Sequence, residues 1–217
     1  MRLTDYIGPY WAGAEVMYAV IIAMTFTSTL RGKIGFFDMY YTVIYSALFC
    51  CIAWGIADGS FYAWERNYNI RLENKIIEFS KTVDKNEAAI PLIREQLDDT
   101  ILRNIDEKAR HEMYNQLVKY LARVGAIRKL STRESFDIIF RTFMASSVAG
   151  LIVVLPFFLI DHPIYALGIS NLLGISLLFM CGYFRAQDRN LLTRVTIGLG
   201  TAMIGIIIAV VTVLLGG

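Results

Sequence analysis

The sequence has little of the residues that build disulfide-stapled or metal-centred small domains. Its 217 residues include only three cysteines, two histidines and four prolines. The cysteines Cys50, Cys51 and Cys181 all lie in apolar runs, and no CxxC or Cys/His spacing occurs. The sequence therefore predicts neither a disulfide framework nor a structural zinc site.

A charge excess and catalytic motifs are also missing. The formal net charge is +2, which gives no electrostatic reason to expect a nucleic-acid partner. There is no P-loop, no GxSxG, no HExxH and no GxGxxG in a strand–helix context. We therefore expect no enzymatic activity and no permanently bound cofactor.

Long apolar runs dominate what is present. The chain is 56% hydrophobic and its mean hydropathy is +0.49, which is too apolar for an ordinary soluble domain. Five runs approach or reach the roughly twenty helical residues needed to cross a bilayer. They cover residues 11–30, 39–57, 143–160, 164–183 and 195–215. The first is not expected to be a cleavable signal, because only Arg2 precedes it as a basic residue and several more runs follow.

This pattern predicts an all-α integral membrane protein with five transmembrane helices and a helical insert between the second and third. Residues 1–58 carry the first two spans, 59–140 form the insert, which continues the second span, and 141–217 carry the last three. Residues 59–142 hold fifteen of the twenty-one Lys and Arg. We expect the insert to form helices over 71–81, from 86 through 102, and over 106–124, with 131–140 leading into the third span.

Basic residues predict the orientation. The loop 185–194 carries three arginines, and the hairpin at 161–163 carries no Lys or Arg. The positive-inside rule places the N-terminus and the insert in the cytosol and the C-terminus outside. Arg31 and Lys33 in the first loop argue weakly for the opposite orientation.

Two carboxylates fall within or at the ends of the predicted spans, Glu15 and Asp58. Antiparallel spans joined by a short loop bring them to a similar depth, and acids at such depth usually face an interior or a water path. We expect them to line an ion path with Met17 and Tyr62, the thioether favouring a transition metal. The alternatives are that Asp58 is hydrated at the interface, that Asp58-Gly59 marks a kink or helix end, and that Met17 faces lipid.

A polar stripe continues from Asp58 if the second span extends as a helix. Tyr62, Glu65, Asn69 and Glu73 then share one face. We expect Glu65 and Glu73 to supply metal ligands below the buried acid. A solvated helix face beside an aromatic belt is the alternative.

The insert offers one further candidate metal site. Glu107 and His111 are four residues apart, and Glu112 is adjacent, so one helix face presents all three near each other. The alternative is an exposed acidic helix. Glu95, Asp98 and Asp99 form a second acidic group.

Small residues recur on one face of the last span at Gly198, Thr201, Gly205 and Ala209. Such stripes let helices pack closely. Together with the amphipathic insert helices, the stripe predicts a homodimer.

The layout resembles the vacuolar iron transporter family and its prokaryotic relatives. The closing stretch GYFRAQDRNLLTRVTIGLGTAMIGIIIAVVTVLLGG is similar to the small basic loop and Gly/Ala-rich last span of that family. The first span departs from the family pattern: it reads GAEVMYA, so Glu15 stands where the family has an Asp-Gly pair. The insert has fewer acids and methionines than the family's.

The resemblance implies a dimeric exporter that moves Fe²⁺ or Mn²⁺ out of the cytosol in exchange for protons. We expect a divergent prokaryotic-type member in the plasma membrane, or in a vacuolar-type membrane if the source is eukaryotic. The alternative function is a membrane scaffold that transports nothing and whose insert binds a protein partner.

Overall fold

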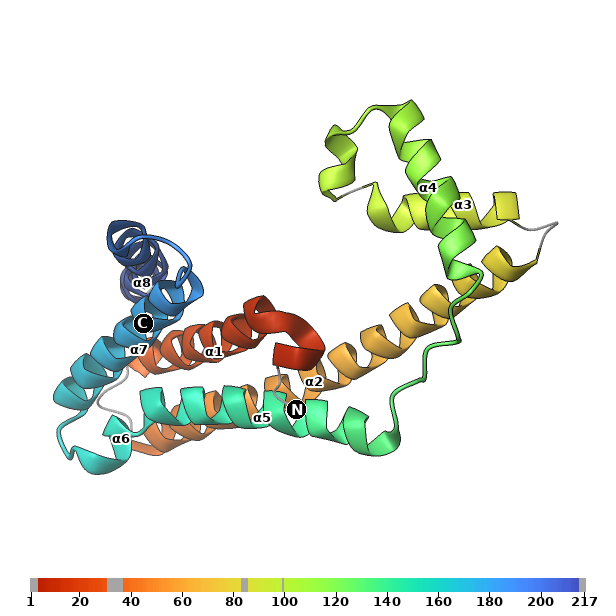
Figure 1. Cartoon of the computed structure of the whole chain (residues 1–217). Helices are drawn as coiled ribbons and strands as arrows, with labels where there is room; N and C mark the ends of the chain where they lie inside the picture. Colours follow the sequence, from red (N-terminus) through yellow and green to blue (C-terminus); the bar gives the residue numbers. More distant parts are fainter. Residues whose placement is uncertain (1–3, 31–36, 83–85, 99, 215–217) are drawn as a thin grey trace. The chain divides into compact units, whose positions relative to one another are not determined.

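The structure is a computed structural model that describes residues 4–30, 37–82, 86–98 and 100–214. All regular elements in these ranges are helices (Figure 1). They are α1 (Thr4–Ser28), α2 (Phe37–Lys81), α3 (Asn86–Leu97), the 3₁₀ helix η3 (Ile101–Asn104), α4 (Glu107–Leu121), α5 (Thr132–Val154), α6 (Pro156–Leu159), α7 (Pro163–Arg185) and α8 (Leu191–Leu214). The all-helical prediction is confirmed over this part of the chain.

Four of these helices are long and apolar enough to cross a membrane. They are Tyr40–Lys81, Thr132–Val154, Pro163–Arg185 and Leu191–Val211. The first predicted span corresponds to α1, whose side chains are described from Gly13 onward, and the apolar stretch Gly13–Ser28 is shorter than the other four. Lipid offers no hydrogen-bonding partners, so an apolar run of this length satisfies its backbone by forming a helix.

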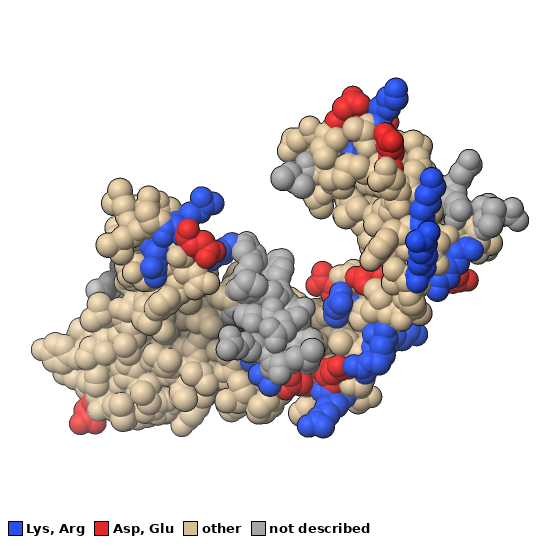
Figure 2. Space-filling view, in the orientation of Figure 1, with Lys and Arg blue, Asp and Glu red and all other residues tan. Residues whose placement is uncertain are grey.

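The chain divides into two compact units, 1–63 with 132–217, and 64–131. The first contains the apolar helices, and most of its visible surface carries no charge (Figure 2). Its charged side chains lie mainly at the turn between α7 and α8 and on the first turns of α5. The second carries many Lys and Arg side chains (Figure 2). Its range lies within the predicted insert 59–140.

Hydroxyl groups link neighbouring helices of the first unit. Ser146 Oγ on α5 donates to the carbonyl of Cys51 on α2 at 3.0 Å, and Ser170 Oγ on α7 donates to Val153 on α5 at 2.7 Å. Thr201 Oγ1 on α8 lies 2.8 Å from the carbonyl of Leu178 on α7. Each such bond inside a bilayer contributes about 0.6 kcal/mol. They fix how far each helix is rotated about its own axis.

Exposed aromatic side chains occur near both ends of the apolar part of α2 and beside them on neighbouring helices. Tyr41, Tyr45 and Phe158 are exposed at one end, with the Tyr45 and Phe158 rings 5.9 Å apart. Phe61 and Phe136 are exposed at the other. Tyr41 and Phe61 are twenty residues apart on α2, or about 30 Å at 1.5 Å per residue, which matches the hydrocarbon thickness of a bilayer.

One predicted boundary is wrong, and one predicted span is divided. The third span, expected over about 143–160, is covered by α5, which ends at Val154, and by the short α6, which starts at Pro156. Proline lacks the N–H that would continue the helix. In the insert, α3 ends at Leu97 and does not continue to 102, because Thr100 accepts a hydrogen bond from Leu102 N and starts η3. Residues 132–140 belong to α5 itself.

The second unit has a small core of its own. Ile76 of α2, Ala89 and Ile93 of α3, and Tyr114 and Val118 of α4 are buried together. Asn74 on α2 then holds the extended return segment: its side chain accepts from Ile127 N at 2.7 Å and donates to Ile127 O at 2.9 Å. The amphipathic stripes predicted for the insert helices are therefore covered at least partly within the chain.

The small-residue stripe on α8 also packs within the chain. A Cβ at Gly198 would lie 2.9 Å from the Phe179 ring, and one at Gly205 would lie 2.9 Å from Leu178, both residues of α7. The stripe is therefore occupied by α7. It no longer supports a dimer, which stays a prediction.

Candidate functional site

Glu15 on α1 is fully buried among the helices of the first unit, with 0% of its surface exposed. The hydroxyl of Tyr62 on α2 donates a hydrogen bond to Glu15 Oε1 at 2.5 Å. An acidic side chain at the centre of a membrane helix costs about 2.5–3.5 kcal/mol on insertion scales. One neutral hydrogen bond offsets only part of that cost.

Asp58 stands one turn before Tyr62 on the same face of α2 and is half-buried. Its carboxyl is close enough to interact electrostatically with the carboxyl of Glu15. Glu15 Oε2 is buried and has no donor among the described residues. Two ionised carboxylates only accept hydrogen bonds, so their contact requires a proton or a cation between them. The structure thus brings Glu15, Asp58 and Tyr62 together.

Two glycines of α2 let α5 pack closely beside this site. A Cβ at Gly59 would lie 2.7 Å from Ile139 Cα, and one at Gly55 would lie 2.8 Å from Phe143 Cα. Both obstacles are backbone atoms of α5, so only glycine fits without moving a helix. The helix continues through Asp58-Gly59, so this pair does not mark a helix end. The four-residue spacing of the glycines in GIADG is the sequence signal for this packing, which was not among the predictions above.

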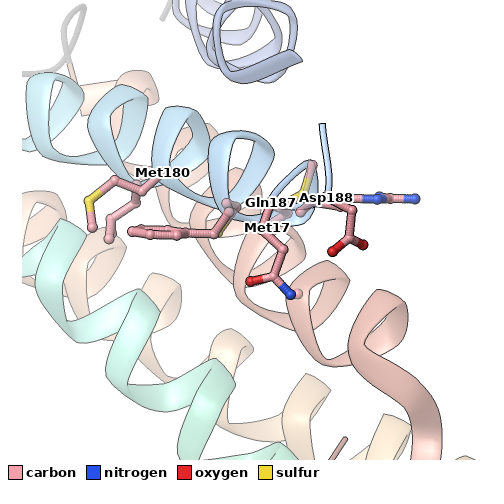
Figure 3. A pocket seen from close by; sticks show the side chains of 9 residues that line it. Met17, Met180, Gln187 and Asp188 are labelled. Carbon is pink, nitrogen blue, oxygen red and sulfur yellow. The ribbon is translucent and has the colours of Figure 1, made fainter. Parts of the chain in front are cut away.

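The structure does not bring Met17 into this group. Positions 15 and 17 are about 200° apart around a helix, so they face different neighbours. Met17 lines a pocket between α1 and α7, as Figure 3 shows. Without Met17, the atoms near Glu15 that could bind a metal ion are all oxygens.

Glu65 and Glu73, predicted as metal ligands below Asp58, belong to the second unit. Glu65 is exposed, and Glu73 pairs with Arg66 at 3.3 Å. A metal at Glu73 would have to compete with that arginine. Their role as ligands stays a prediction.

The cluster predicted in the insert lies on α4, where Glu107, His111 and Glu112 are all exposed. Glu107 is 3.6 Å from Arg94 of α3 in an ion pair. Over the described ranges, no three His, Cys, Asp or Glu side chains are grouped so that they could hold a metal ion. Metal binding by this cluster also stays a prediction, without geometric support.

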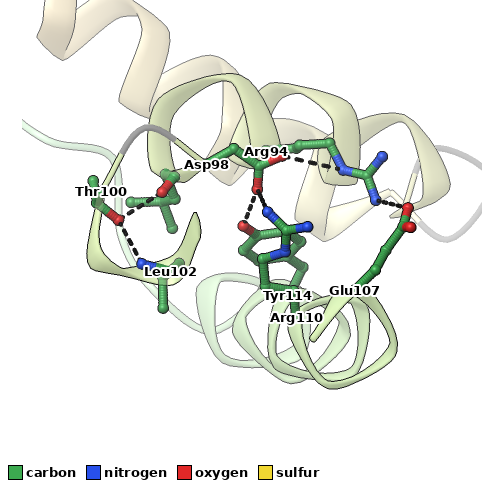
Figure 4. A network of polar contacts seen from close by, with 8 residues as sticks. Arg94, Asp98, Thr100, Leu102, Glu107, Arg110 and Tyr114 are labelled. Atoms are coloured by element: carbon green, nitrogen blue, oxygen red, sulfur yellow. Dashed lines mark hydrogen bonds and ion pairs between the residues drawn. The ribbon is translucent and has the colours of Figure 1, made fainter. Parts of the chain in front are cut away.

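Asp98, from the second acidic group, joins α3 to α4 (Figure 4). It accepts a hydrogen bond from the Tyr114 hydroxyl at 2.5 Å and pairs with Arg110 at 3.4 Å and Arg94 at 3.7 Å. The hydrogen bond to Asp98 raises the pKa of Tyr114. Asp99 lies outside the described residues.

Replacing Asp98 with asparagine is expected to loosen the packing of α3 against α4. The change keeps the size of the side chain but removes the charge that Arg94 and Arg110 face, a loss of about 1–3 kcal/mol. Hydrogen exchange of the full chain should show faster exchange of α3 and α4 amides. Glu95→Gln is the matched control, because Glu95 forms no ion pair in the described part of the insert. Equal exchange in both variants would contradict the role of Asp98.

No protein family model matches this chain, and no curated protein matches it significantly. The functional argument therefore depends on the geometry of the chain itself.

Proposed function

We propose that this chain is a membrane transporter that moves Mn²⁺ or Fe²⁺ out of the cytosol, with Glu15, Asp58 and Tyr62 as its ion-binding site. The observation that carries the proposal is Glu15, a fully buried acid in a bundle of apolar helices. Its second oxygen has no donor among the residues that the structure describes, and a second carboxyl lies beside it. A protein that only scaffolds others has no need for such a pair.

The donor set favours one of the two metals. Two carboxyls and a phenol offer only oxygen atoms, a set that suits Mn²⁺ better than softer transition metals. Since the carboxyl pair requires either a proton or a cation, an arriving dication displaces the proton. This competition is a physical basis for metal–proton exchange.

Purified protein in liposomes tests the proposal. With a metal-sensitive dye inside, Mn²⁺ added outside should change the dye signal faster than in empty liposomes, and an opposing pH gradient should alter the rate. Fe²⁺, Co²⁺ and Zn²⁺ run in parallel give the selectivity. No metal entering above the empty-liposome rate, in either direction of the pH gradient, would reject transport.

The proposed topology has five spans, with α1 as the fifth membrane-crossing helix and the insert in the cytosol. Single cysteines placed at Asp161 and at Lys108, both exposed, test it with a membrane-impermeant maleimide. We expect labelling at position 161 from outside the cell and at position 108 only after the membrane is opened. Labelling of both positions from the same side would contradict the five-span topology.

The scaffold alternative is favoured by one observation. Residues 64–131 form a compact unit with a core and ion pairs of their own, as an independent binding module would. Absence of metal flux together with an intact fold would leave the scaffold as the leading function.

Mass measurement in mild detergent decides whether the chain forms the predicted homodimer.

A further inference from the structure

A second feature of the first unit lies away from Glu15, where the end of α7 approaches α1. A cavity of about 600 Å³ opens there, within the size range of small-molecule sites. Its apolar part is lined by Met17 of α1 and by Leu177, Met180 and Phe184 of α7. Met180 lies at one end of the cavity and Asp188 at the other (Figure 3).

A smaller cavity of about 300 Å³ adjoins it at the turn between α7 and α8. Arg185 and Asp188 line both cavities, and Arg189 lines the smaller one. Among the described residues that line the two cavities, two arginines stand against one aspartate, so these lining residues carry a net positive charge. The pair of cavities therefore has an apolar part beside a basic part, at the end of helices that are apolar enough to cross a membrane.

We propose that the two cavities form a binding site for one anionic phospholipid, with its phosphate at Arg185 and Arg189 and an acyl chain in the cavity between α1 and α7. Basic pockets between membrane helices bind anionic head groups for the same electrostatic reason. The bilayer supplies this ligand at high local concentration. The site is independent of the proposed transport, because its residues do not include Glu15, Asp58 or Tyr62.

Gly13 offers a way to fill the apolar part. It lines the cavity, and a Cβ built on it meets no atom within 4 Å. Gly13→Phe therefore adds a ring at the cavity wall without a clash at its Cβ. Gly168→Phe is the matched control, since Gly168 on α7 is equally open, is exposed and does not line the cavity.

The full chain, purified in detergent, is titrated with palmitoyl-oleoyl-phosphatidylglycerol or with the matching phosphatidylethanolamine, and bound lipid is counted by native mass spectrometry. We expect the anionic phosphatidylglycerol, called the glycerol lipid below, to bind more tightly than the phosphatidylethanolamine, called the ethanolamine lipid. Gly13→Phe should weaken it by about tenfold, the effect of excluding about two methylene groups, and Gly168→Phe should not. Arg189→Gln should weaken it by about fivefold.

Asp188→Asn distinguishes the two head groups by the sign of its effect. Removing this negative charge should strengthen binding of the anionic glycerol lipid. If an ammonium group bound Asp188 instead, the same change would weaken the ethanolamine lipid.

Three results would overturn the proposal: equal binding of the two lipids, loss of ethanolamine-lipid binding in Asp188→Asn, or wild-type binding of the glycerol lipid in both Gly13→Phe and Arg189→Gln. If circular dichroism shows that Gly13→Phe does not fold, the two charge variants decide, because both lie in the turn after α7.

Discussion

Replacing Glu15 with glutamine is expected to abolish Mn²⁺ flux in liposomes. The amide keeps the shape of the side chain and can still accept from Tyr62, but it removes the buried charge that a dication needs. The loss should be about a hundredfold or more, since substitutions one shell further from a metal already cost about 10–100-fold in metal affinity or activity. The variant should fold, because a neutral side chain is easier to bury than an acid.

Asp58→Asn should have the same effect, because the second carboxyl supplies the other negative charge. Glu65→Gln is the matched control on the same helix. It is exposed and lies outside the pair, so we expect flux to continue. Its predicted role as a metal ligand below Asp58 leads us to expect a lower apparent affinity. Circular dichroism and size-exclusion chromatography establish that each variant keeps its fold and oligomeric state. Normal transport by both Glu15→Gln and Asp58→Asn would show that the carboxyl pair is not the ion site.

Gly59→Ala is expected to destabilise the helix bundle and to reduce flux together. The added methyl group would lie 2.7 Å from Ile139 Cα and 3.1 Å from Ile139 O, so α5 must move away from α2. Overpacking of this kind costs about 1–3 kcal/mol. Because Asp58 precedes Gly59 directly on α2, any shift of α2 as the two helices move apart displaces one of the two carboxyls.

Thermal unfolding in detergent measures the loss of stability in Gly59→Ala, and flux into liposomes measures the loss of transport. Gly200→Ala on α8 is the control: Gly200 is exposed, and a Cβ there meets nothing within 4 Å. It should change the free energy of unfolding by about 0.5 kcal/mol or less. A Gly59→Ala protein as stable as Gly200→Ala would show that α2 and α5 are not packed as closely as the structure has them.

Much of the helical pattern could be predicted because it depends on local properties. Apolar runs of sufficient length gave α2, α7 and α8 to within a few residues, apart from the continuation of α2 to Lys81, which the polar stripe indicated. The errors came from single residues. Pro156 ends α5, and Thr100 starts η3, which the hydrophobic spacing of Ile101 and Leu102 does not reveal.

The site was harder to predict because it depends on how each helix is rotated about its axis. The order of the spans predicted that Glu15 and Asp58 lie at similar depth. It did not predict that Glu15 faces α2 while Met17 faces α7. That rotation follows from contacts between distant residues, such as Ser146 with Cys51 and Gly59 with Ile139. The stripe on α8 shows the same difficulty, since its spacing indicated close packing without naming the helix that it contacts.

The depth of the carboxyl pair has an electrical consequence. Asp58 lies three residues from Phe61, about 4.5 Å along an apolar span of about 30 Å. In the proposed transport, an ion that enters from this side would cross roughly 15% of the membrane field before binding at the pair. Moving two charges through the whole field involves about 4.6 kcal/mol per 100 mV, so binding accounts for only about 0.7 kcal/mol of it. In the proposed transporter, the membrane potential would therefore act almost entirely on the passage of the ion from the carboxyl pair to the opposite side.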